Sequence, residues 1–203
     1  VYVTDTGNHT LRVVTAAGVV GTLAGATALS GSTDGVGNGA LFAYPEGLAV
    51  DGSGNLYIAD HDNHTIRKVN SSGGVTTLAG AAGISGSADG AGGAARFNGP
   101  TGVAVDGSGN VYVADAGNSS IRRITAGGTV TTFAGFSGVG GSSDGVGGSA
   151  RFNVARGVAV DNAGNAGPWS TEWMLSIVQP QVTSVRWEDA AGNLLSGPVN
   201  EGT

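Results

Sequence analysis

The chain has 203 residues, of which 39 are glycine and none is cysteine. Nine lysines and arginines stand against fifteen aspartates and glutamates, and the net charge of −6 argues against nucleic acid as a partner, because phosphate contacts need clustered cations. The lack of cysteine excludes a disulfide framework, a thiolate metal site and a cysteine nucleophile. No apolar run approaches the ~18 residues of a membrane-spanning helix, so no membrane insertion is expected.

A repeat of 55 residues extends from the N-terminus to about residue 165. GLAVDGSGNLYIAD at 47–60 recurs as GVAVDGSGNVYVAD at 102–115, and GVAVDNAGN returns at 157–165. Within a unit, valine and isoleucine alternate with small or polar residues, and Asp-Gly-Ser-Gly-Asn marks a tight turn. This pattern predicts four strands in the best-preserved unit, at about 102–106, 111–115, 120–125 and 129–134. Four short antiparallel strands per repeat are typical of a β-propeller blade.

A short motif follows the second predicted strand of each unit. It is Asn-His-Thr-Leu at 8–11, Asn-His-Thr-Ile at 63–66 and the more divergent Asn-Ser-Ser-Ile at 118–121. With the surrounding G-V-A-V-D-x-x-G-N-V-Y-V-A-D pattern, it resembles the NHL-repeat β-propeller family, in particular bacterial members with a long T-L-A-G…D-G…A-R-F connection. The resemblance covers about 1–165. It implies an all-β propeller, typically of six four-stranded antiparallel blades, often on secreted or surface proteins, but no single function.

Counting strands gives an incomplete ring. The expected parts are a partial blade at 1–25 without its innermost strand, full blades at 47–80 and 102–135, and an incomplete blade from 157. Fewer than three blades cannot close, and the open ends would expose strand edges. We therefore expect a fragment of a six-bladed propeller. The alternative is a partial propeller that closes by self-association.

The composition changes at about residue 166. All three tryptophans and the only methionine lie in 166–203, and two strand-like runs, at 173–178 and 182–187, flank a Gln-Pro-Gln linker. Over short stretches this segment resembles bacterial immunoglobulin-like or fibronectin-type modules. We expect a short β-rich segment, made of a linker and the start of such a module, with an irregular tail as the alternative.

Several charged residues recur once per unit and are expected to be structural. A catalytic constellation is asymmetric, whereas repetition indicates a contact that every blade needs. We expect hydrogen-bonded pairs within or between blades, since buried charges require partners. His9 and His64 are also one repeat apart and are expected to support a turn. The recurring pairs are Asp5 with Arg12, Asp60 with Arg67, and Asp115 with Arg122.

Residues that break the repeat are better candidates for ligand recognition. His61 replaces the Thr6 and Ala116 of the other units, and with Asp62 and His64 it forms a His-Asp-x-His cluster that could hold a metal only with a further ligand. A second group varies just before the innermost strand, near the channel mouth, although mere drift is the alternative. The five candidate ligand-binding residues are His61, Asp62, Tyr44, Glu46 and Arg156.

The candidates fall on one predicted face of the propeller. The long connections between blades and the loops after each second strand share that face, and family members commonly bind ligands there. No catalytic, metal or cofactor residue is assigned. Arg96 and Arg151 precede a phenylalanine in successive units, and we expect each arginine to cover its neighbouring ring.

The sequence favours a non-catalytic scaffold or binding module of a secreted or cell-surface bacterial protein, with a protein or glycan partner. This placement rests on the resemblance and the composition, since no signal peptide is visible in the segment. The alternative is a metal-dependent lyase or lactonase of propeller type, whose catalytic residues lie mostly in other blades. RNA binding is a third hypothesis, disfavoured by the few cations.

Overall fold

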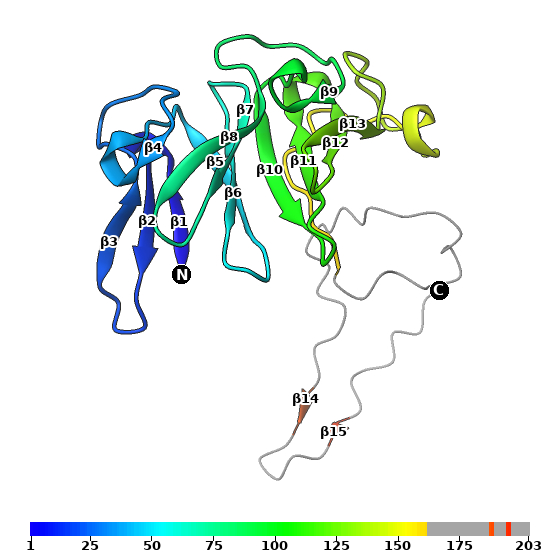
Figure 1. The fold of residues 1–203 in the computed structure, drawn as a ribbon. Helices are drawn as coiled ribbons and strands as arrows, with labels where there is room; N and C mark the ends of the chain where they lie inside the picture. Colours follow the sequence, from blue (N-terminus) through cyan, green and yellow to red (C-terminus); the bar gives the residue numbers. More distant parts are fainter. Residues whose placement is uncertain (162–186, 189–193, 196–203) are drawn as a thin grey trace.

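The computed structural model describes residues 1–161, together with the backbone of 187–188 and 194–195. Three antiparallel sheets follow one another along the chain and stand side by side (Figure 1). We call them blade 1, blade 2 and blade 3. The strands contain Val, Ile, Leu, Tyr and Thr in short runs, and Gly-rich turns separate them.

Blade 1 has three strands in the order β1-β2-β3, and blades 2 and 3 have five each. In blade 1 these are β1 (Tyr2–Asp5), β2 (Thr10–Val14) and β3 (Val20–Ala24). Blade 2 consists of β5 (Pro45–Val50), β6 (Leu56–Asp60), β7 (Thr65–Val69), β8 (Gly74–Gly80) and, beyond β8, β4 (Gly35–Val36). Blade 3 consists of β10 (Pro100–Val105), β11 (Val111–Asp115), β12 (Ser120–Ile124), β13 (Thr129–Ala134) and, beyond β13, β9 (Gly90–Ala91).

Short 3-10 turns complete the elements. Two of them, η1 (Thr6–Asn8) and η4 (Ala116–Asn118), directly follow β1 and β11, which occupy equivalent positions in the repeat. The other three lie in the long connections, namely η2 (Gly37–Gly39), η3 (Gly92–Ala94) and η5 (Gly147–Ser149). A further pair of strands, β14 (Trp187–Glu188) with β15 (Leu194–Leu195), falls in the C-terminal segment.

The predicted all-β fold of four-stranded antiparallel blades is confirmed, and the four strands predicted in 102–134 are present within two residues. The prediction missed the fifth strand. The connection that enters blade 2 first crosses to its outer edge, where Gly35 pairs with Val75 and Val36 with Gly74. The connection that enters blade 3 does the same at Gly90 and Ala91. Each connection therefore binds both edges of the blade that follows it.

The hydrophobic core lies between the blades. Its first cluster joins blade 1 to blade 2 through the connection, and its second joins blade 2 to blade 3 in the same way. Phe42 and Phe97 are the fully buried aromatic residues that the two connections contribute. The first cluster comprises Leu11, Ala24, Ala40, Phe42, Leu56, Ile58, Val69 and Val75.

Glycine at the innermost strands allows the blades to approach closely. A Cβ atom at Gly47 of β5 would overlap the carbonyl oxygen of Thr101 in β10, and one at Gly102 would overlap the carbonyl oxygen of Arg156. The glycine that opens the G-L/V-A-V segment of blades 2 and 3 is therefore required for the close packing of their innermost strands.

Residues 157–161 form no strand, although the sequence predicts the innermost strand of a further blade there. In blades 2 and 3 the innermost strand pairs with the strand that follows it, and residues 166–170, Ala-Gly-Pro-Trp-Ser, lack that strand's pattern. The linker and module predicted for 166–203 lie outside the described residues, apart from the short pair β14 and β15. Among described residues, no helix is long and apolar enough to span a membrane.

Candidate functional site

A buried arginine links each full blade to the connection that precedes it. In blade 2, Arg67 Nη1 donates to Asp60 Oδ2 at 2.7 Å, and Arg67 Nη2 donates to Asp34 Oδ1 at 2.8 Å. The guanidinium also donates to the carbonyl oxygens of Leu41 and Thr33 and lies 5.3 Å from the centre of the Phe42 ring. The side chains of Arg67 and Asp60 are fully buried. One residue thus holds β6, β7 and the connection together.

Blade 3 repeats this arrangement. Arg122 donates to Asp115 at 3.0 Å and to Asp89 at 2.7 Å, and its guanidinium lies 5.3 Å from the Phe97 ring. The expectation that the repeated aspartates and arginines form structural pairs is confirmed. By contrast, the expectation that Arg96 covers Phe97 is wrong, because Arg122 lies over that ring while Arg96 donates to backbone carbonyls.

The pKa values of the aspartates in this network are shifted in opposite directions, upward for those on the strands and downward for Asp34 of the connection. Burial raises the pKa of Asp60 and that of Asp115, while hydrogen bonds, including those from Asn63 and Asn118, act against the rise. Partial burial would also raise the pKa of Asp34. There, however, hydrogen bonds from the Thr77 backbone and from Arg67 outweigh it, and the pKa is lowered.

His9 and His64 have the supporting role that their repetition predicts. Nδ1 of His9 accepts a hydrogen bond from the Tyr44 N–H at 3.2 Å, and Nδ1 of His64 accepts one from the Gly99 N–H at 3.0 Å. Both histidines have left-handed backbones, and each imidazole fixes the connection just before the next innermost strand. His64 is therefore turned to the backbone of blade 3's connection.

Four of the five candidate ligand residues lie in the turn after β6 and at the start of β5, with the His61 ring beside Gly99 of the connection that enters blade 3. The turn after β6 is hydrogen-bonded to the connection, with the His61 N–H donating to the Tyr44 carbonyl and the Asp62 N–H to the Ala43 carbonyl. The His61 ring lies between two carboxylates. Its Nδ1 donates to Asp62 Oδ1 at 2.6 Å, and its Nε2 lies 4.0 Å from Glu46 Oε1.

Tyr44 gives this cluster an exposed aromatic surface. Its backbone has φ +50°, in the left-handed region, where the next repeat has Gly99. Its side chain is half exposed, and its ring meets the His9 ring edge to face with centres 4.9 Å apart. A non-glycine residue in this conformation costs about 1–2 kcal/mol, so Tyr44 is retained at some expense of stability. We call Tyr44, Glu46, His61 and Asp62, with His9, the Tyr44 cluster.

Arg156 is not part of the Tyr44 cluster. Its carbonyl oxygen accepts a hydrogen bond from Thr101 Oγ1 at 2.9 Å, which places its backbone beside β10 of blade 3. The sequence predicted that all five residues lie on one face, but it did not predict which of them lie close together. It also assigned His9 only to a turn and missed its contact with Tyr44, because a residue that repeats gives no signal of a local role.

No three histidine, aspartate or glutamate side chains are grouped as a metal-ion site would require, as far as residues 1–161 are concerned. The side chains of the His-Asp-x-His pattern do not point to a common centre, because Nδ1 of His64 accepts a hydrogen bond from the Gly99 backbone.

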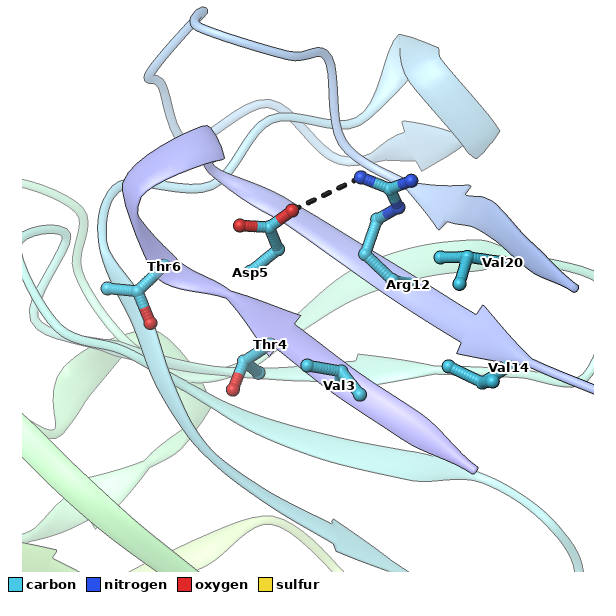
Figure 2. A pocket seen from close by; sticks show the side chains of 7 residues that line it. All are labelled: Val3, Thr4, Asp5, Thr6, Arg12, Val14 and Val20. Atoms are coloured by element: carbon cyan, nitrogen blue, oxygen red, sulfur yellow. Dashed lines mark hydrogen bonds and ion pairs between the residues drawn. The ribbon is translucent and has the colours of Figure 1, made fainter. Parts of the chain in front are cut away.

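The described residues also form a hollow of about 370 Å³ on the outer side of blade 1. Figure 2 shows Val3, Val14 and Val20 along it, with Arg12 reaching Asp5 at 3.1 Å. All seven lining residues occupy repeat positions whose blade 2 counterparts belong to β6, β7, β8 or the turn after β6. The hollow therefore corresponds to the interface that a connection fills in blades 2 and 3. It is lined by Val3, Thr4, Asp5, Thr6, Arg12, Val14 and Val20.

Comparison with known families agrees with the blade architecture. The model of the NHL repeat matches residues 42–69 and 97–124, which hold the buried phenylalanine, the innermost two strands and the arginine-bearing strand of blades 2 and 3. This chain contains two NHL repeats. Over 95 residues it is 39% identical to Protein SUPPRESSOR OF QUENCHING 1, chloroplastic, of Arabidopsis thaliana, which amounts to 46% of this chain but 9% of that relative.

Solved structures share the fold of this NHL-repeat chain. A Bacteroides thetaiotaomicron protein of unknown function aligns with a TM-score of 0.65 at 24% identity, covering 78% of this chain and 38% of its own. An auxiliary nutrient binding protein from the same species gives a TM-score of 0.62 at 21% identity, covering 79% and 40%. The NHL-repeat chain thus spans less than half the length of these structures, and at such identities the likeness concerns the fold.

Proposed function

We propose that the chain is a non-catalytic binding module that recognises a protein or glycan through the Tyr44 cluster on its loop face. The observation that carries this proposal is that the repeating and the non-repeating polar residues have different surroundings. The repeated charges of blades 2 and 3 are engaged in the arginine network, whereas the non-repeating Tyr44, Glu46, His61 and Asp62 gather in one place.

The chemistry of the Tyr44 cluster suits a hydroxyl-rich or amide-rich partner. Asp62 and Glu46 offer carboxylate acceptors that are half and one-third exposed, respectively. Tyr44 offers an aromatic face with a polar end, a combination enriched where proteins bind partners. We place the protein outside the cell or at its surface, in keeping with a bacterial binding protein.

Tyr44→Gly tests the proposal, because it removes the ring and at the same time relieves the left-handed strain. Binding to a glycan array, and to a panel of bacterial envelope proteins, should fall at least about tenfold, while the free energy of unfolding should stay equal or rise by about 1 kcal/mol. Val154→Gly is the matched control. Val154 occupies the same repeat position with φ +56°, so this variant should gain stability without losing binding.

Two results would contradict the proposal. One is unchanged binding by Tyr44→Gly to a partner that the wild-type chain captures. The other is stoichiometric metal in the purified protein together with turnover in lactonase and lyase assays, which would favour the metal-dependent enzyme instead.

A further inference from the structure

Each long connection carries one exposed aliphatic residue at the same repeat position. These residues are Leu29, Ile84 and Val139, and their exposed fractions are 55%, 53% and 45%. The residues on both sides of them are alanine, glycine or serine. None of the three belongs to a core cluster, so packing within the described blades does not explain why this position stays aliphatic. We call Leu29 and Ile84 the aliphatic tips.

Ile84 is exposed even though blade 2, which its turn contacts, has a neighbour on each side. Blade 2 packs against blade 1 through the first core cluster and against blade 3 through the second. The repeated phenylalanines and arginines of this region are completely buried, whereas Ile84 is half exposed. The exposure of Ile84 is therefore a property of the turn that carries it.

Hydrogen bonds fix the turns that present the aliphatic tips. The Leu29 N–H donates to the Ala26 carbonyl at 3.1 Å, and the Ile84 N–H donates to the Ala81 carbonyl at 3.0 Å. The residue before each tip has a left-handed backbone. A side chain held on an ordered turn loses little conformational freedom when a partner covers it, which favours binding.

The same turns are hydrogen-bonded to the segments that hold the Tyr44 cluster. The turn of Leu29 donates an N–H to the Asn8 carbonyl at 3.3 Å, and the turn of Ile84 donates one to the Asn63 carbonyl at 3.2 Å. Each asparagine directly adjoins a member of the Tyr44 cluster in the sequence. The long connections lie at the same end of the three sheets (Figure 1). The aliphatic tips and the Tyr44 cluster are therefore parts of one hydrogen-bonded surface.

The exposed carboxylates of the Tyr44 cluster indicate the charge of a partner. Asp62 and Glu46 are half and one-third exposed, and within residues 1–161 their only ion-pair partner is His61. Carboxylates next to exposed aliphatic groups complement a surface with both apolar and basic side chains. A glycan offers no apolar side chains to cover leucine and isoleucine, and the carboxylates repel an anionic lipid surface.

We propose that the aliphatic tips and the Tyr44 cluster together bind a protein segment in which apolar side chains stand next to lysine or arginine. The apolar side chains cover Leu29 and Ile84. The basic groups approach Asp62, Glu46 and the half-exposed Tyr44 ring, whose face attracts cations. This inference rests on the proposed function and narrows its partner class to a basic and apolar stretch of protein.

Selection of random short peptides from a display library tests the proposal on the full chain. Bound peptides should be enriched in apolar residues together with lysine or arginine, and depleted in aspartate and glutamate. Leu29→Ser or Ile84→Ser should weaken the affinity for a selected peptide at least about tenfold, because each removes an apolar contact. Val50→Ser is the matched control and should leave the affinity unchanged, since Val50 is 46% exposed at the far end of β5. Circular dichroism melts should show that these variants remain folded.

A second variant tests the charges. Glu46→Gln combined with Asp62→Asn should weaken the affinity for the selected peptide and remove most of its dependence on salt. The proposal is overturned if no peptide is enriched, if acidic peptides are enriched, or if the two serine variants bind like the wild type. Binding to uncharged phosphatidylcholine vesicles that both serine variants lose would assign the tips to a lipid surface and also overturn it.

Comparison with Tyr44→Gly separates this inference from the proposed function. Loss of glycan or envelope-protein binding by Tyr44→Gly, with full binding by Leu29→Ser and Ile84→Ser, contradicts the role of the aliphatic tips alone. Loss of peptide binding by the two serine variants, with full binding by Tyr44→Gly, supports the tips and contradicts the proposed role of Tyr44.

Discussion

Blade 1 and blade 2 have nearly the same repeat, yet the same positions differ in burial. Arg67 and Asp60 are fully buried, while Arg12 and Asp5 have side chains that are 28% and 29% exposed. The difference comes from the connection. Segment 25–46 brings Asp34 and Phe42 to Arg67, whereas no described segment brings the corresponding carboxylate and ring to Arg12. A blade is therefore completed by the connection before it.

The largest expected effect is that of Arg67→Met. It leaves the Asp60 carboxylate buried without its cation and removes the bonds to the connection, so the free energy of unfolding should fall by about 4 kcal/mol. Arg12→Met is the matched control and should cost less than about 1 kcal/mol, since that ion pair is partly exposed. Urea denaturation of both variants checks this. Equal losses would remove the distinction between the blades.

Phe42→Ala should be the next most damaging change, at about 3 kcal/mol, because it opens a cavity in the core between blades 1 and 2. Phe136→Ala alters a phenylalanine that is more than half exposed and should cost less than about 1 kcal/mol. The midpoints of chemical denaturation measure both. A mild effect of Phe42→Ala would mean that the connection contributes little to the joint between blades.

Gly47→Ala tests the close approach at the propeller axis. The new methyl group would overlap the Thr101 carbonyl of the neighbouring innermost strand, and the strands can separate only by losing contacts, so a loss of about 2 kcal/mol is expected. Gly52→Ala is the control, because a methyl group added at Gly52 would have nothing within 4 Å. Thermal melts of the two variants should differ clearly. If they coincide, the spacing of β5 and β10 is not limited by this glycine.

The smallest expected effect concerns pH. The pKa of Asp34 in the folded chain is lowered from the ordinary 3.8, so the ionised carboxylate stabilises the fold above that value, and this stabilisation is lost as the pH falls through the lowered pKa. Asp34 is half exposed, so its contribution should be below about 1 kcal/mol. Asp34→Asn should lower the melting temperature at pH 7, and the gap from wild type should shrink below about pH 4. A gap that widens on acidification contradicts this.

The sequence predicts the blades well because a period of 55 residues repeats both the alternation and the turns. The structural role of Arg67 follows from the same repetition. The fifth strand could not be predicted, because Gly35 and Val36 are two residues in a Gly-rich segment and acquire strand geometry only by pairing with β8. The partner of Phe97 was also missed, since Arg122 lies 25 positions further on while Arg96 is adjacent.

The candidate site was predicted in part. Placing the connections and the turns after the second strands on one face brought Tyr44 and His61 together, and the structure has them in backbone contact. The distance of Arg156 from them depends on the angle between neighbouring blades around the axis. That angle is set by packing between sheets, as at Gly47 and Gly102, and has no local signature in the sequence.

Amide hydrogen exchange tests the central claim most directly. Strands β2 and β7 occupy the same place in the repeat and are hydrogen-bonded on both sides, so they differ chiefly in the connection packed over β7. We predict that the amides of β7 exchange at least about tenfold more slowly than those of β2. Equal protection of the two strands would contradict the claim that each blade is completed by the connection that precedes it.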